Sequence, residues 1–305
     1  MLSDTARRQR LTPPDGPLNV LIDTDTFNEV DDQFALVHAL LSPEKLKVQA
    51  IYAAPFHNQR STSPGDGMEK SYQEILEILK LINVQADPPV YRGSETFLSS
   101  ETSPIESEAA HDLIKRGMAS AEPLYVIALG ALTNIASALL LEPSLAEHLV
   151  VVWLGGHAFH WSHNREFNLM QERAASRVVL GSGVPLVLIP CMGVTSHLRT
   201  TVPELERYVE PHGAIGQFLV ARFKGYEGEH EGWSKEIWDL APVAYLLDET
   251  WVPTTLVPTP GLHDDLSWNL ETHGADMRLA SFVKRDAIFR DLFRKLERYT
   301  VAQSV

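Results

Sequence analysis

The stretch LNVLIDTDTFNEVDD, residues 18–32, decides the fold. Its first five residues form an apolar run typical of a buried strand, and residues 31–41 begin with the acidic turn that favours the start of a helix. Five carboxylates lie between Asp23 and Asp32. Because ligands of open α/β sheets bind outside the carboxyl ends of the strands, we expect this segment to carry the chemistry of the chain.

Apolar, strand-like runs alternate with helix-length amphipathic stretches over the first two thirds of the chain. The predicted elements are strands at 18–22, 46–53, 124–129, 149–154 and 184–189 and helices at 31–41, 68–82, 133–141 and 172–180. Such alternation is typical of parallel strands joined by crossover helices. The sequence therefore predicts an α/β fold with an open, mostly parallel, doubly wound (Rossmann-like) sheet.

Beyond Thr201 the pattern loosens into a C-terminal helical elaboration. The expected elements there are helices at 203–209, 215–223, 235–247 and 286–299 and an edge strand at 251–258. Long flexible linkers are absent from the sequence. We therefore expect a single domain over residues 1–305, in which the polar, Arg-rich residues 1–16 form a flexible N-terminal tail.

The composition is that of a globular protein with an acidic surface. Of 305 residues, 44% are apolar and 22% are charged, and the formal net charge is −14. The apolar fraction is sufficient for a sizeable core. Because a negative surface repels phosphate, nucleic acid is not expected as a partner.

Cysteine usage and the lack of apolar segments bear on location. Cys191, interpreted as a core residue, is the only cysteine, so no intramolecular disulfide can form and a reducing compartment is favoured. Residues 1–16 lack the apolar core of a secretory signal, and no run of 18 uninterrupted apolar residues occurs. We therefore expect a cytoplasmic protein that does not enter a membrane.

The acidic segment predicts a metal site. A solvated loop and an acidic helix start explain Asp31 and Asp32, but they do not explain Asp23 and Asp25, two residues apart on an emerging strand. Crowded carboxylates in a low-dielectric crevice repel one another unless they share a cation. Oxygen ligands without thiols indicate a hard cation, Ca²⁺ or Mg²⁺.

Two known acidic motifs fit this segment poorly. An EF-hand loop that starts at Asp23 would need glycine where Asn28 stands and glutamate where Phe34 stands. A Mg²⁺-dependent phosphatase of the haloacid-dehalogenase type would use Asp23 as nucleophile, helped by the pair at 264–265. Its motif has Thr or Val where this chain has Phe27, and this enzyme remains an alternative.

Four segments together resemble the inosine-uridine-preferring nucleoside hydrolase family, in the order in which that family has them. They are Asp23-Thr24-Asp25 with Asp31-Asp32-Gln33-Phe34-Ala35-Leu36, the run Leu129-Gly130-Ala131-Leu132-Thr133-Asn134-Ile135-Ala136, Leu154-Gly155-Gly156 with Glu166-Phe167-Asn168, and Trp238-Asp239. The resemblance covers about residues 18–250. Thr133 itself is interpreted as the N-cap of the helix that follows it.

The resemblance implies Ca²⁺-dependent hydrolysis of the N-glycosidic bond of ribonucleosides, with one Ca²⁺ per subunit. By position, the metal ligands are the carboxylates of Asp25, Asp32 and Asp239 and the backbone carbonyl of Leu129. Asp25 is also the implied base that takes a proton from water. Family members are homodimers or homotetramers, which we expect here as well.

The resemblance also assigns residues that bind the ribose. Asp31 matches the residue that, with the metal, holds the 2′- and 3′-hydroxyls, while Glu166 and Asn168 resemble the pair on the other edge of the sugar. Asn164 and Asn58 are candidates for further ribose contacts. The oxocarbenium-like transition state of glycoside cleavage explains why carboxylates and amide oxygens surround the sugar.

The chain departs from the family pattern at two places. The turn between Asp25 and Asp31 holds five residues, 26–30, where the commonest family form has three. Trp238 stands where many members have the histidine that protonates the leaving base. Trp238 resembles one half of the aromatic sandwich of the purine-specific branch, which predicts a purine preference, although a place in the core explains a tryptophan here equally well.

The missing histidine keeps other interpretations open. The chain can be a nucleoside- or ribose-binding protein that has lost turnover. Alternatively, a loop histidine can contact the base or ribose; the candidates are His57, His157, His160 and His163. Tyr226 and Trp233 are predicted to lie in a mobile lid over the base.

Overall fold

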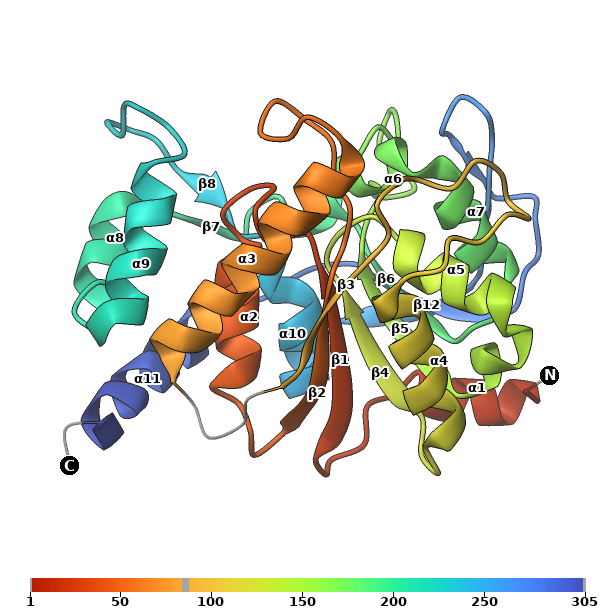
Figure 1. Ribbon diagram of the computed structural model, residues 1–305, viewed down its shortest axis with the longest axis horizontal. Helices are drawn as coiled ribbons and strands as arrows, with labels where there is room; N and C mark the ends of the chain where they lie inside the picture. Colours follow the sequence, from red (N-terminus) through yellow and green to blue (C-terminus); the bar gives the residue numbers. More distant parts are fainter. Residues whose placement is uncertain (1, 84–87, 304–305) are drawn as a thin grey trace.

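The computed structural model describes residues 2–83 and 88–303 and is built around an eight-stranded sheet (Figure 1). The strands, in spatial order, are β3 (Val90–Arg92), β2 (Leu46–Ala53), β1 (Leu18–Thr24), β4 (Leu124–Ala128), β5 (Leu149–Leu154), β6 (Leu186–Ile189), β12 (Asp276–Ala280) and β9 (Thr254–Pro258). All neighbours pair in parallel except β9, which is antiparallel to β12. The predicted α/β class and mostly parallel sheet are confirmed.

Helices cover both faces of this sheet and enclose two apolar cores. The side chains of β1 alternate between them: Val20 and Ile22 lie in one core and Leu21 in the other. The first core is closed by α2 (Asp32–Leu40), α3 (Pro64–Ile82), α8 (Val202–Tyr208), α9 (Gly213–Lys224), α10 (Leu240–Leu247) and α11 (Arg285–Gln303). The second is closed by α4 (Glu108–Ala119), α5 (Thr133–Leu141), α6 (Phe167–Gln171) and α7 (Arg173–Gly181).

The strand order places a crevice beside β1. From β1 the chain builds β2 and β3 on one side and then crosses to β4 on the other, so the order reverses at β1. Crevices at such a reversal, outside the carboxyl ends of the strands, are where open α/β sheets bind ligands. Asn134 fastens the strand ends there, because its Nδ2 donates to Asp23 Oδ2 at 2.9 Å and to the carbonyl of Ala53 at 3.2 Å.

The predicted helix at 235–247 is wrong over its first part. Residues Lys235–Glu236 form the short strand β8, which pairs with β7 (Arg199–Thr200), and α10 begins only at Leu240. Thr133 is not the N-cap of α5 either, because its hydroxyl donates to Glu172 Oε2 at 3.0 Å. The strand β8 and the Thr133 hydroxyl both make contacts between distant segments of the chain, and a local sequence pattern does not encode such contacts.

The expectation that residues 1–16 form a flexible tail does not describe residues 4–11. Residues Asp4–Arg10 form helix α1, and Leu11, which follows it, is fully buried. The Tyr245 hydroxyl donates to the carbonyl of Leu11 at 2.6 Å, and Arg8 Nε donates to Asp276 Oδ2 at 2.7 Å. The start of the chain is therefore packed onto the first core and onto β12.

The remaining elements are short. They are β10 (Gly261–Leu262), β11 (Trp268–Asn269), the 3₁₀ turns η1 (Pro143–Glu147) and η3 (Glu249–Trp251), and the π-turn η2 (Cys191–Thr195). Cys191 is buried, as expected of a core residue. Among the described residues no helix has both the length and the apolar character needed to span a bilayer.

If the N-terminal segment is packed as described, truncating Leu11 will destabilise the whole protein. Leu11→Ala removes a fully buried leucine, and such changes cost about 2–5 kcal/mol because a cavity remains. We expect a lower urea midpoint with an unchanged slope. Leu270→Ala, at a leucine that is 53% exposed, is the matched control and should change the free energy of unfolding by less than about 0.5 kcal/mol. Equal midpoints for both variants would show that the segment is a tail.

Candidate functional site

A cavity of about 210 Å³ lies at the carboxyl ends of the strands, beside β1. Its walls come from the segments after β1, β4, β5 and β6 and from the start of α10. The residues that line it are Asp25, Asn28, Glu29, Asp31, Asp32, Leu129, Leu154, His157, Arg165, Glu166, Phe167, Asn168, Cys191, Met192, Trp238 and Asp239. Most of the residues that the sequence pointed to therefore meet in one place.

Three carboxylates from two distant parts of the chain converge in this cavity. Asp31 and Asp32 stand at the start of α2, and Asp239 immediately precedes α10. One oxygen from each lies within 4.8 Å of the others, and all three residues are buried. Side chains more than 200 positions apart thus form a cluster that could hold a metal ion.

Asp25 lies beside this cluster, directly after β1. Its carboxylate rests against the backbone of Gly130, where a Cβ would stand only 3.0 Å from the Asp25 Cγ. Any side chain at position 130 would therefore press on the carboxylate. Asp25 Oδ2 is buried and has no hydrogen-bond partner among the described residues, and the same is true of Asp239 Oδ1.

Burial and mutual repulsion make these carboxylates hard to ionise without a cation. Burial raises the pKa of Asp31 to about 8, and burial followed by neighbouring carboxylates raises the pKa values of Asp25 and Asp239 well above the usual range. The pKa of Asp32 rises to about 6, because burial outweighs the hydrogen bond from Thr24. Buried polar atoms normally have partners, so two unpartnered oxygens in an all-oxygen cluster fit a hard divalent cation.

The carbonyl of Leu129 faces the same cavity. It accepts a hydrogen bond from Asn168 Nδ2 at 2.8 Å, and the same Nδ2 reaches the carbonyl of Leu154 at 3.2 Å. A carbonyl oxygen has two lone pairs, so this bond leaves one available. The amide nitrogen of Asn168 is fully used by these carbonyls, which holds the side chain in place.

Glu166 forms the polar end of the cavity. Its carboxylate accepts hydrogen bonds from the backbone N–H groups of Gly156, Asn168 and Leu169, each at 2.9 Å. Burial nevertheless raises its pKa to about 7. Asn164 lies just behind this wall: its Oδ1 accepts from the backbone of His157 at 2.5 Å, and its buried Nδ2 has no partner among the described residues.

Asn58, like Asn164, is a ribose candidate that lies away from the cavity lining. It does not line the cavity; its Nδ2 donates at 2.7 Å to Oδ1 of Asn28, which does. Asn28 and Glu29 belong to the five-residue turn at 26–30, which is two residues longer than the commonest family form. Both of them line the cavity. Asn58 is therefore placed to support Asn28 rather than to touch a ligand.

Trp238 meets both expectations that the sequence left open. Its ring is partly buried against the first core, and it also lines the cavity. Of the loop histidines, only His157 lines the cavity, where its Nδ1 accepts from the backbone N–H of Met192 at 3.3 Å. That acceptor role leaves the proton of the neutral ring on Nε2.

Lys235 is a residue of the site region that sequence reasoning missed. It forms an ion pair with Glu29, and its ammonium lies 5.1 Å from the ring centroid of Tyr226. Burial alone would lower the pKa of Lys235, but Asp31 and Glu29 raise it further than burial lowers it. Tyr226 and Trp233, predicted as a lid, do not line the cavity; Trp233 packs against Phe223 with ring centroids 4.8 Å apart.

The residues that a phosphatase would need are not together. Asp23 is buried behind the cavity wall, where Asn134 holds it, and it does not line the cavity. Asp264 is exposed and pairs with Arg177 at 2.8 Å, while Asp265 accepts from the hydroxyl of Ser267 at 2.6 Å. None of the three aspartates reaches the carboxylate cluster.

Comparisons with known proteins agree with this geometry. The sequence profile of a family described as inosine-uridine preferring nucleoside hydrolase matches residues 20–298. The chain is 28% identical over 216 residues to the pyrimidine-specific ribonucleoside hydrolase RihA of Escherichia coli O9:H4 (strain HS). That match covers 63% of this chain and 65% of the relative, so the chain spans just under two thirds of the length of the curated relatives it matches.

Solved structures share the fold. A plant nucleoside hydrolase, PpNRh1, and a purine-preferring ribonucleoside hydrolase from Gardnerella vaginalis each superpose with a TM-score of 0.70 at 20% identity. An inosine-guanosine nucleoside hydrolase gives a TM-score of 0.72 at 18% identity. Each comparison covers 92% of this chain and 99% of the other.

The buried state of His157 predicts a pH dependence of stability. Burial and then His163 lower the pKa of His157 to about 4, whereas an unfolded histidine titrates near 6.5. Below pH 6.5 His157 therefore binds a proton in the unfolded chain but not in the folded chain. The free energy of unfolding consequently falls as the pH drops toward 4. We expect His157→Gln to flatten this part of a plot of Tm against pH.

The control is His273→Gln, at an exposed histidine, which should leave the Tm profile unchanged. A residual slope is expected in every variant, because burial also lowers the pKa of His38. If the His157→Gln profile between pH 4 and 6.5 runs parallel to that of the unaltered protein, His157 is not held neutral.

Proposed function

Since the chain belongs to the inosine-uridine preferring nucleoside hydrolase family, we propose that it hydrolyses the N-glycosidic bond of ribonucleosides to free base and ribose. The observation that carries the proposal is the buried carboxylate cluster of Asp31, Asp32 and Asp239 with Asp25 beside it. A cation-binding crevice at the reversal of the strand order is suited to a small polar substrate such as a nucleoside.

We propose one Ca²⁺ per subunit, held by Asp25, Asp32, Asp239 and the carbonyl of Leu129. The ligand set is made only of oxygens, two of the carboxylates have an unpartnered buried oxygen, and the carbonyl keeps a free lone pair. When bound, a divalent cation lowers the pKa of a water molecule and orients it beside the two vicinal hydroxyls of a ribose.

The side chains of this chain have distinct proposed roles around that sugar. Asp25 accepts the proton of the attacking water, and Asp31 accepts hydrogen bonds from the 2′- and 3′-hydroxyls. Glu166, Asn164 and Asn168 hold the opposite edge. Because Nδ2 of Asn168 is used by two carbonyls, its Oδ1 is the atom left to accept from a ribose hydroxyl.

Charge distribution explains why so many acids surround one ring. Loss of the base leaves positive charge on the anomeric carbon and the ring oxygen of the sugar. The carboxylates of Asp25, Asp31 and Glu166 are fixed by the fold before the substrate enters, so they stabilise this charge without reorganising. His157 is the loop histidine positioned on the cavity wall, and its Nε2–H is a donor available to the substrate.

We expect the protein to release ribose from inosine in the presence of Ca²⁺ and to lose this activity with a chelator. Asp32→Asn removes one negative charge from the cluster and should lower kcat/KM by 100-fold or more, the loss typical of a metal-site group. Reducing-sugar release and chromatography of the free base measure the reaction. Ca²⁺ should also raise the Tm of the unaltered protein but not that of Asp32→Asn.

Asp264→Asn is the matched control for this measurement, because it removes a carboxylate that is exposed and lies outside the cavity. It should leave ribose release unchanged. Inosine binding in calorimetry without any ribose release would instead establish the nucleoside-binding protein without turnover. Release of inorganic phosphate from a phosphomonoester, abolished by Asp23→Asn, would establish the phosphatase.

The base preference that we propose is for purines. The relatives differ in this respect: RihA is named pyrimidine-specific, whereas the Gardnerella vaginalis enzyme is named purine-preferring. Trp238 supports the purine side, because an indole on the cavity wall can stack on a base but cannot protonate it. Stacking favours the larger ring system of a purine.

We therefore expect a higher kcat/KM for inosine than for uridine. Trp238→Ala should lower kcat/KM for inosine roughly tenfold or more, because stacking of a base on an aromatic ring contributes about 1–3 kcal/mol. Trp238→Phe keeps an aromatic face and should retain most of the activity. A clear preference for uridine in steady-state assays, or an alanine variant as active as the phenylalanine variant, would contradict the stacking role.

We also propose that the protein acts in the cytoplasm as a homodimer or homotetramer. The single buried cysteine, Cys191, is compatible with a reducing compartment. The proposal of self-association rests on the family alone. Its partners are thus expected to be a nucleoside and further copies of the chain, without nucleic acid or membrane.

A further inference from the structure

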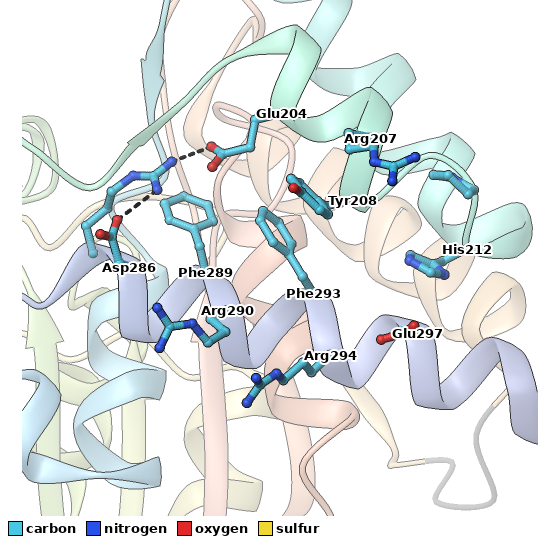
Figure 2. Close-up of a pocket in the computed structure, with 12 residues that line it drawn as sticks. Glu204, Arg207, Tyr208, His212, Asp286, Phe289, Arg290, Phe293, Arg294 and Glu297 are labelled. Atoms are coloured by element: carbon cyan, nitrogen blue, oxygen red, sulfur yellow. Dashed lines mark hydrogen bonds and ion pairs between the residues drawn. The ribbon is translucent and has the colours of Figure 1, made fainter.

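A second hollow lies away from the cavity, in a groove between α8 and α11. Its volume is about 610 Å³, and none of the residues that line it lines the cavity. Figure 1 shows both helices at the end of the molecule that also holds the C-terminus. Figure 2 shows the wall of the groove, with Arg207 and Tyr208 from α8 above Phe293 and two arginines from α11. The nucleoside reaction makes no use of this groove.

The groove concentrates positive charge in an acidic protein. Arg207, Arg290 and Arg294 line it and are exposed, and none of the three has an ion-pair partner among the described residues. Arg285 differs, because Glu204 and Asp286 neutralise it (Figure 2). Four arginines line the groove against three carboxylates, those of Glu204, Asp286 and Glu297, so the groove carries a net positive charge on a chain whose formal net charge is −14.

An aromatic surface lies between these arginines. Tyr208 is 49% exposed, and its ring is stacked on Phe293 with centroids 5.3 Å apart and planes 15° apart. Phe293 in turn packs against the buried Phe289. The tyrosine ring is therefore held against Phe293 while about half of the residue stays exposed. The guanidinium of Arg207 lies 6.0 Å from its centroid.

We propose that this groove binds a nucleotide, with its ring stacked on Tyr208 and its phosphate paired with Arg290 and Arg294. Guanidinium groups match phosphate oxygens in bidentate geometry, and an aromatic face accepts any base by stacking. The volume lies within the range of small-molecule sites. A nucleic acid polymer is less suited, because the acidic surface beyond the groove repels a long polyanion.

This inference does not rest on the proposed hydrolase activity. Arg290 and Arg294 lie one turn apart on the exposed side of α11, and replacing both leaves the carboxylate cluster and its supports intact. The site and the reaction can therefore be tested separately, and the failure of one leaves the other standing.

The test uses AMP as the probe, measured by titration calorimetry on the full chain with Asp32→Asn, the variant in which the proposed hydrolysis is expected to fall at least 100-fold. In this background the double variant Arg290→Gln/Arg294→Gln should weaken AMP binding at least tenfold, because two charge-assisted contacts are lost. Arg298→Gln, at an exposed arginine of the same helix outside the groove, is the matched control and should bind as before. Equal Tm values for the three proteins show that the fold is retained.

Tyr208→Ala separates the two parts of the proposed site. It should weaken AMP several-fold and leave the weaker binding of inorganic phosphate unchanged. AMP affinity that is the same in the double variant and in Arg298→Gln would overturn the proposal, since the nucleotide would then bind elsewhere. Tighter groove-dependent binding of a single-stranded oligonucleotide than of AMP would also overturn it.

Discussion

The crowding of carboxylates beside β1 is the constraint on which the rest of the site depends. Asp25, Asp31, Asp32 and Asp239 are all buried, and each raises the cost of ionising the next. Such a cluster is unstable as four bare anions in a low-dielectric crevice. It becomes favourable when a cation is shared, so the cluster is best understood as one half of an ionic structure whose other half is a metal ion.

The fold makes this crowding possible by holding the carboxylates rigidly. β1 lies between β2 and β4 at the point where the order of the sheet reverses, and its side chains are buried in both cores. Its carboxyl end is therefore held in a fixed position. Asn134 ties Asp23 to β2, and Gly130 lets the backbone approach Asp25 closely. Repulsion that a flexible loop would relieve by moving is therefore retained in the native state.

The sequence was sufficient for the half of the site that is local. The alternation of strands with crossover helices follows from periodicity and from turn residues, and the structure confirms it. The acids after β1 are read directly from the sequence, and they lie at the carboxyl end of that strand. No sequence feature near Asp239 indicates that its carboxylate lies close to that of Asp32. Only the family resemblance predicted that the two belong to one site. Position 239 is set by the packing of α10 under the sheet, a contact between segments about 200 residues apart.

Three of the elements that the sequence missed share a physical cause, whereas the amphipathic helix α4 was missed despite its apolar face. β3 and β12 are short, with three and five residues. Every residue of β3 is half-buried, and β12 mixes buried and half-buried residues, so neither shows a clear apolar period. α1 is a polar helix whose anchor is the carbonyl of Leu11 and the charge of Arg8. Lys235 and Thr133 likewise contact residues that are distant in the sequence, Glu29 and Glu172. Tertiary contacts of this kind override local propensity and leave no periodic signal.

The charge balance of the cavity connects the five-residue turn to catalysis. Glu29 adds a sixth carboxylate to the wall, beside the four aspartates and Glu166, and it forms an ion pair with Lys235. A divalent ion, Lys235 and Arg165 together carry four positive charges, fewer than the negative charges of the six acids around them. In the proposed reaction the remaining negative charge is not a defect. A ribosyl group gains positive charge as the base departs, so a site that stays anionic after binding its metal stabilises the transition state more than the neutral substrate.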